Sequence, residues 1–254
     1  MVAKQERKFK GFSPRTFKFF RQLKAHNNKV WFEAHRADYE TYVLQPLRDL
    51  VVDLGDFMLT IDSDFEIAPA VNKTISRIYR DTRFSSDKSL FKTAMWIAFH
   101  RPSLDWKDDP GYFFEISTNF YRYGMGFYSA STQTMAKFRE LIDEDPCGTS
   151  RLISFYSKQR VFDVEGEKYK RILDKTKPGK IQQWYQWKNL YLMCTRKMEK
   201  RLFSSKLVDD LKADFKLAAP LYHFLHKAKR KASGDRDSSF SEAVRFKILR
   251  KKSR

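Results

Sequence analysis

Hydrophobic residues in the first quarter of the chain recur at the spacing of amphipathic helices. Ser13-Pro14, a hydroxyl residue before proline, is typical of a helix start, and Asn27-Asn28 is expected to end that helix. An apolar stripe of aromatic and aliphatic residues predicts a second helix from about Lys29 to Leu44. Pro46 is expected to interrupt it, and residues 47–59 continue as a third helix. The opening part of the chain is therefore predicted to be helical.

The middle of the chain changes to a period of two, which is typical of strands. Alternation predicts extended segments at 75–80, 112–118 and 121–130, with a loop of turn-forming residues at 84–89. Residues 93–100 fit either a buried strand or a short helix, and a strand is favoured. The segments at 112–118 and 121–130 form the clearest hairpin, in which Glu115 and Arg122 are expected to meet across the strands. Because a tight hairpin joins antiparallel neighbours, the sheet is predicted to be antiparallel.

Helical spacing returns after Ser131. It predicts helices at 132–143, 150–159, 181–188 and 204–227, and strands at 161–164 and 190–196. Pro220 is expected to kink or break the closing helix. The chain is therefore assigned to the α+β class, an antiparallel sheet flanked by N-terminal and C-terminal helices. We expect one domain over residues 1–230 and a basic, disordered tail over residues 231–254.

Charge changes the picture next. The chain carries 50 Lys and Arg against 31 Asp and Glu, a formal net charge of +19, which favours polyanionic partners such as nucleic acid or a phosphorylated ligand. The excess is concentrated in residues 227–254 and in a second cluster between Lys168 and Lys180. The alternative is that the charge serves solubility alone.

Several classes of protein are disfavoured. Cys147 and Cys194 form no metal or redox spacing, so reduced thiols and a cytoplasmic location are expected. No stretch has the length of apolar residues that a membrane span needs. Gly-rich phosphate loops and dinucleotide motifs are missing from the sequence, and no cofactor is predicted. His223 and His226 have helical spacing without a third ligand, so no metal site is predicted.

Charged and hydroxyl side chains are most concentrated between Ile75 and Thr93. The predicted ligand-binding residues are Arg77, Arg80, Arg83, Ser85, Lys88 and Lys92. Arginine holds carboxylates and phosphates through paired N–H groups, which makes an anion site one hypothesis. The alternative is an internal network in which these cations pair with the protein's own carboxylates, namely Glu33, Asp38, Asp81 or Asp87. The sequence leaves both open.

Three residues are weak candidates for acid–base catalysis, His35, Asp81 and Glu115. They define an alternative function, an enzyme acting on a phosphorylated or acidic small molecule. A histidine on an aromatic helical stripe is more often a hydrogen-bonded boundary residue. The rings of residues 184–187 lie beside the second basic cluster and suggest stacking with single-stranded nucleic acid, although a place in the core is favoured. A further alternative is an interaction protein without a ligand.

Three stretches of the chain resemble signatures of a known family. These are Asn27–Tyr39 with Pro46, Ile75–Thr93, and Gly111–Ser117 with Gly124–Tyr128. They resemble the domain-of-unknown-function 2461 family over residues 12–130, and more loosely up to about 227. The sequence departs from the family pattern around Val30, where an Arg-Glu pair is expected before Trp-Phe, and at Leu90, where proline is expected. The resemblance implies a fold but carries no activity.

Overall fold

The computed structural model describes residues 7–83, 86–103 and 105–234. The helices are α1 (Pro14–Ala25), α2 (Lys29–Ala34), α3 (Arg36–Tyr39), α4 (Gln45–Ile61), α5 (Thr132–Glu144), α6 (Pro146–Lys158), α7 (Gly179–Tyr185) and α8 (Leu207–Ala232). Shorter turns are the π-helix η1 (Glu40–Leu44) and the 3-10 helices η2 (Trp106–Asp108) and η3 (Lys200–Phe203). The strands are β1 (Ala94–Phe99), β2 (Gly111–Ser117), β3 (Phe120–Gly126), β4 (Asp163–Glu165) and β5 (Tyr191–Lys197).

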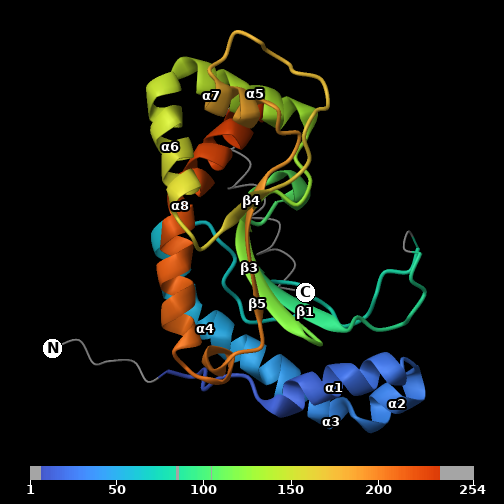
Figure 1. Ribbon diagram of the computed structural model, residues 1–254. Coiled ribbons are helices and arrows are strands. Elements are labelled where there is room, and N and C mark those ends of the chain that lie inside the picture. The colour runs from blue at the N-terminus through green and yellow to red at the C-terminus, as the bar shows by residue number, and fades with distance from the viewer. Residues whose placement is uncertain (1–6, 84–85, 104, 235–254) are drawn as a thin grey trace, which may run out of the picture.

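The strands form one five-stranded antiparallel sheet in the order β1-β2-β3-β5-β4. Helices α4 and α8 lie against one face of it, while α1–α3 lie at one end and α5–α7 at the other (Figure 1). The antiparallel sheet with N-terminal and C-terminal helices confirms the predicted α+β class.

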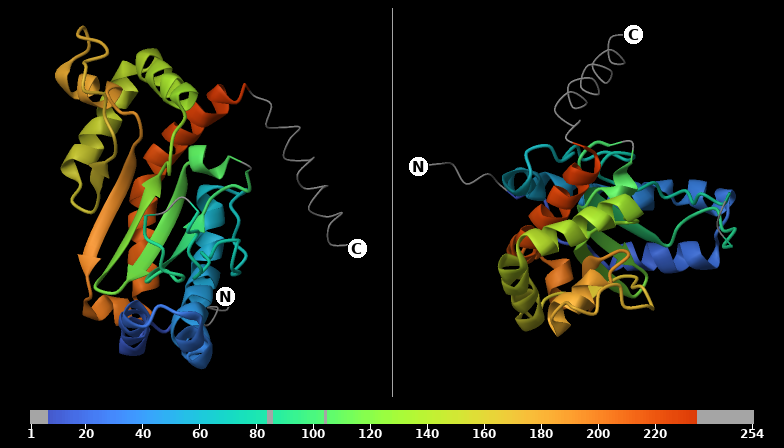
Figure 2. Two further views of the ribbon diagram at one scale, coloured as in Figure 1. Left: turned by 90° about the vertical axis from the view of Figure 1, so that its right-hand side faces the viewer. Right: turned by 90° about the horizontal axis from the view of Figure 1, so that it is seen from above.

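The core follows the period of the strands. Alternate residues such as Met95, Tyr112 and Phe114 are fully buried beneath α4 and α8. Their neighbours along each strand point to the opposite face and are partly exposed. Figure 2 (left) looks onto this opposite face and shows α8 behind the strands. One face of the sheet is thus the core, and the other lies nearer to solvent.

The predicted second helix is confirmed over residues 29–44 except for a break at His35. The His35 backbone leaves helical geometry (φ −116°, ψ 17°), and its Nδ1 bonds the Trp31 carbonyl at 2.8 Å. Pro46 does not interrupt the chain's helical path, because it occupies the first turn of α4, where a proline costs little. In a regular helix the Tyr42 carbonyl would accept from residue 46, and here the Thr16 hydroxyl donates to it instead at 2.6 Å.

Other boundaries also differ from prediction. Residues 75–80 are extended but join the sheet only through isolated bridges, Ile75 with Ile97 and Tyr79 with Phe91. Helix α6 begins at Pro146 rather than near 150, because Asp145 caps it by accepting from the Gly148 N–H at 2.8 Å. Helix α8 runs through Pro220 to Ala232, past the predicted domain boundary at 230. The predicted tail from 235 onward lies outside the described residues.

Among the residues described, no helix is long and apolar enough to cross a membrane. Both cysteines are free thiols, Cys147 exposed and Cys194 buried.

Candidate functional site

The first two sequence signatures lie against each other in the fold. The Asn27 side chain donates to the Phe91 carbonyl and accepts from the Phe91 N–H, both at 2.9 Å, as a neighbouring strand would. The Phe32 ring stacks on the Phe91 ring with centroids 4.3 Å apart, and Tyr79 packs beside Phe91 at 5.0 Å. Helix α2 and the cation-rich segment therefore form one structural unit at the β1 edge of the sheet.

Three of the predicted cations gather at this edge. The Lys92 ammonium donates to the Arg77 carbonyl at 2.9 Å and lies over the Trp96 ring, 4.2 Å from its centroid. Burial lowers the pKa of Lys92, and the positive charges of Arg77 and Arg80 lower it further. The exposed Arg77 side chain makes no hydrogen bond or ion pair within the part of the chain that the structure describes. Arg77, Arg80 and Lys92 are hereafter called the cation edge.

Arg80 of the cation edge and the remaining predicted ligands make contacts within their own loop. Arg80 bonds Asp87 at 2.9 Å and Ser89 at 3.1 Å. Arg83 forms a two-pronged pair with Asp81, at 3.0 and 2.8 Å. Lys88 donates to the Thr82 carbonyl at 2.8 Å, and Ser85 lies outside the described residues. The internal pairing considered from sequence thus occurs with Asp81 and Asp87, while Glu33 pairs with Arg36 on its own helix.

The three weak catalytic candidates lie in three different settings. His35 stacks on Trp31 with centroids 4.1 Å apart, the boundary role that the sequence favoured. Hydrogen bonds from Arg83 hold the pKa of Asp81 well below its usual range. Glu115 accepts from Arg122 at 3.1 and 3.0 Å, across the hairpin as predicted. Each candidate is engaged with its own neighbour.

The second aromatic group belongs to the core. Trp184 and Trp187 are 7% and 5% exposed, so the predicted core placement is confirmed. Lys168 lies over the Trp187 ring at 4.0 Å, which covers it further. In the described residues, no group of three metal-ligating side chains includes His223 and His226 or forms elsewhere.

Sequence reasoning missed a polar cavity of about 330 Å³ between β3, β5, η3 and α8. Tyr123 donates to Asp214 at 2.6 Å and accepts from Arg196 at 3.3 Å. Tyr121 donates to Glu199 at 2.7 Å. Burial raises the pKa of Asp214, more than the hydrogen bond from Tyr123 lowers it. No local motif identifies this cluster, because its members are far apart in the chain: Tyr123 and Asp214 are separated by 91 positions.

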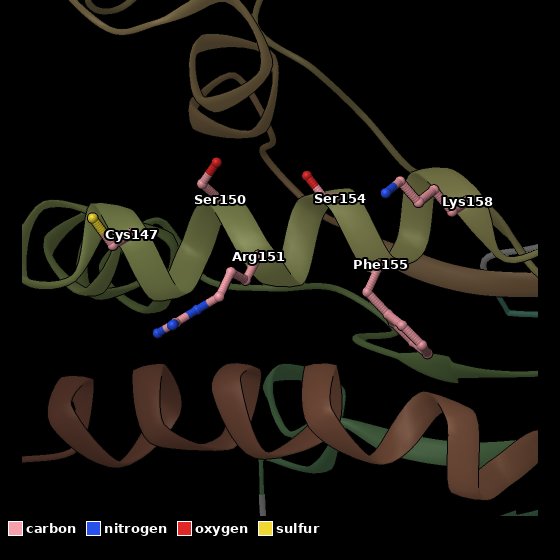
Figure 3. Close-up of a pocket in the computed structure, with 6 residues that line it drawn as sticks. All are labelled: Cys147, Ser150, Arg151, Ser154, Phe155 and Lys158. Carbon is pink, nitrogen blue, oxygen red and sulfur yellow. The ribbon is translucent and has the colours of Figure 1, made fainter.

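Two other hollows lie on the surface of the described residues. One follows a single face of α6, where Cys147, Arg151, Phe155 and Lys158 recur at helical spacing (Figure 3). The other, of about 550 Å³, lies between the start of α1 and the η1–α4 turn. The first is the surface of one helix, and the second lies beside a helix start without a group that points to a ligand.

The fold and the cation edge together define an α+β protein with an antiparallel sheet and a cluster of cations beside its first strand. A family model described as "Conserved hypothetical protein (DUF2461)" matches residues 15–224. The chain belongs to this family, as its three signatures indicated. A comparison with curated proteins found no match.

Proposed function

We propose that the protein binds an anionic, phosphate-bearing ligand at the cation edge. One observation carries the proposal: Lys92 is held against the Arg77 carbonyl and the Trp96 ring beside Arg77 and Arg80, and of these three side chains only Arg80 forms an ion pair in the described part of the chain. Like charges held together raise the free energy of the unliganded site. A phosphate group would replace this repulsion with attraction.

The chemistry of the three side chains suits phosphate. The Arg77 guanidinium offers parallel N–H donors that match two phosphate oxygens. Lys92 adds a compact charge, and its position between the Arg77 carbonyl and Trp96 is fixed by contacts on both sides. Arg80 is oriented by Asp87 and Ser89. The edge is therefore partly pre-organised by the protein's own groups.

Thermal denaturation with inorganic phosphate, pyrophosphate and a nucleoside triphosphate tests this proposal. A ligand at about a hundred times its dissociation constant should raise the melting temperature by about 5 to 10 °C. Arg77→Gln should abolish the rise and change the melting temperature of the free protein little, because the exposed Arg77 side chain forms no hydrogen bond or ion pair with the described residues and interacts with Asp81 only through its charge. Arg151→Gln, an exposed arginine on α6, is the matched control and should keep the rise.

A different result favours the internal network. If none of the three phosphates shifts the wild-type protein, and Arg80→Gln alone melts lower, the cations serve folding and the proposal fails. The enzyme alternative gains no support from His35, Asp81 and Glu115, since each has a separate partner. A cytoplasmic location is part of the proposal and is supported by the two free thiols.

A further inference from the structure

The face of the sheet opposite α4 and α8 carries aromatic rings. Trp96 on β1, Phe113 on β2 and Phe120 on β3 occupy alternate positions that point away from the core. All three are partly exposed, and none belongs to the core cluster or packs against it. Figure 2 (left) shows β2, β3 and β5 on this side with no helix in front of them. The three rings and this surface are hereafter called the ring face.

Gly124 leaves one position of the ring face without a side chain. It pairs with Phe113 across β2 and β3, and a Cβ at this position would lie 3.1 Å from Phe113 Cε1. The same Cβ would also lie 1.9 Å from the Leu192 carbonyl oxygen, so only glycine fits. No side chain therefore stands beside the Phe113 ring on the β3 side. Trp96 is its diagonal neighbour on β1, within reach of one extended ligand.

Cations accompany these rings. Lys92, a member of the cation edge, lies over the Trp96 ring. Arg122 lies 5.9 Å from the centre of the Phe120 ring, and the exposed Lys197 stands opposite Phe120 on β5. A cation thus lies beside Trp96 and beside Phe120, although Arg122 also pairs with Glu115 between these two rings.

We propose that the ring face binds single-stranded nucleic acid, with bases stacked on Trp96 and Phe113 and phosphates at the cation edge. This inference rests on the proposed function and names the class of its ligand. Every base has a face that stacks on an aromatic ring, and cations beside the rings hold the backbone. The net charge of +19 complements a polyanion. Rings fixed on a sheet surface reach bases only where these are unpaired, so duplex is disfavoured.

Fluorescence anisotropy of the full chain with a labelled oligothymidylate of about ten nucleotides tests the inference. The single strand should bind more tightly than a duplex of the same length. Trp96→Leu and Phe113→Leu should each weaken single-strand binding about tenfold. Phe155→Leu, which removes a ring that is 40% exposed on α6, is the matched control and should bind as the wild type. Trp96→Phe keeps a ring and should recover most of the affinity, which separates stacking from a general packing defect.

Salt and pyrophosphate separate the inference from the proposed function. The effect of the ring variants should persist at higher salt, because stacking releases no counterions, whereas charge-driven binding falls.

The shift in melting temperature caused by pyrophosphate should be unchanged in Phe113→Leu. If pyrophosphate binds but the oligonucleotide does not, the inference fails and the proposed function stands. The same holds if pyrophosphate binds and both leucine variants bind the oligonucleotide as tightly as the wild type. Self-association through the ring face, seen as a dimer that Phe113→Leu dissolves, would also overturn it. If neither probe binds, both proposals fail.

Discussion

Asp62 is a buried carboxylate that joins three segments far apart in the sequence. It follows α4, accepts from Arg101 after β1 at 2.9 Å, and accepts from the Tyr222 hydroxyl on α8. Burial alone would raise the pKa of Asp62, but the hydrogen bonds from Arg101, Tyr222 and the Asp64 N–H outweigh it and hold the pKa below its usual range. Its ionised form is therefore bound more tightly in the folded state than in the unfolded chain.

This carboxylate makes stability depend on pH. A lowered pKa in the folded state contributes stability above the unfolded pKa, and the contribution is lost as the pH falls through the folded pKa. We expect Asp62→Asn to lower the free energy of unfolding by about 2 kcal/mol at pH 7. The difference from wild type should shrink as the pH falls below about 4. Urea denaturation at several pH values measures both.

Asp64→Asn is the control for this prediction. Asp64 pairs with the same Arg101 at 3.0 Å, but its side chain is 53% exposed. An exposed pair contributes little, so this variant should change stability by less than about 1 kcal/mol. A loss in Asp62→Asn that stays constant down to pH 3 would contradict the role given to its charge.

For single residues, the sequence predicted which side chains are candidates for binding but not which groups they contact. The cations of residues 77–92 stand out by composition, whereas the pairing of Arg83 with Asp81 and the exposure of Arg77 depend on how the loop folds. The rings Trp96 and Phe113 were not predicted as surface groups. Alternation shows that two faces exist, but which face the helices cover is decided by packing far along the chain.

Among the elements, α8 shows how a proline is accommodated inside a helix. Pro220 has no N–H to donate, and the helix nevertheless continues to Ala232. The Tyr156 hydroxyl of α6 donates to the Leu217 carbonyl at 2.9 Å and accepts from the Leu221 N–H at 3.2 Å. One side chain thus satisfies backbone groups on both sides of the proline.

Removing this hydroxyl should leave buried backbone groups without partners. We expect Tyr156→Phe to lower the free energy of unfolding by about 1 to 3 kcal/mol. Tyr185→Phe is the matched control, because its hydroxyl bonds the exposed Asp143 and its loss should cost less than about 1 kcal/mol. Denaturant unfolding of the two variants gives the comparison, and equal losses would refute the bridging role of Tyr156.

Elements with a strong local signal were predicted well. The hairpin of β2 and β3, with Glu115 opposite Arg122, has the expected register because alternation and a short turn determine it. The expected interruption at Pro46 was wrong because a tertiary contact compensates for the missing N–H: the Thr16 hydroxyl donates to the Tyr42 carbonyl from another helix. The sequence of either helix alone does not contain that partner.

For the whole molecule, the core is one continuous cluster. It runs from Phe9, before α1, to Ala228, near the end of α8, and includes inward-facing residues of β1, β2, β3 and β5. Helix α8 contacts α4, α5 and β3, so the last helix described holds together elements that lie far apart in the sequence. No core position among the described residues lies beyond Ala228.

We therefore expect the chain to unfold in one cooperative transition. Circular dichroism and tryptophan fluorescence should give the same midpoint in urea, because helices and buried rings belong to the same cluster. Truncation after Gly234 should change the free energy of unfolding by less than about 0.5 kcal/mol, whereas removal of α8 from Pro220 onward should abolish folding. Two separate midpoints would contradict a single domain. A large loss on truncation after Gly234 would show that residues beyond it belong to the folded unit.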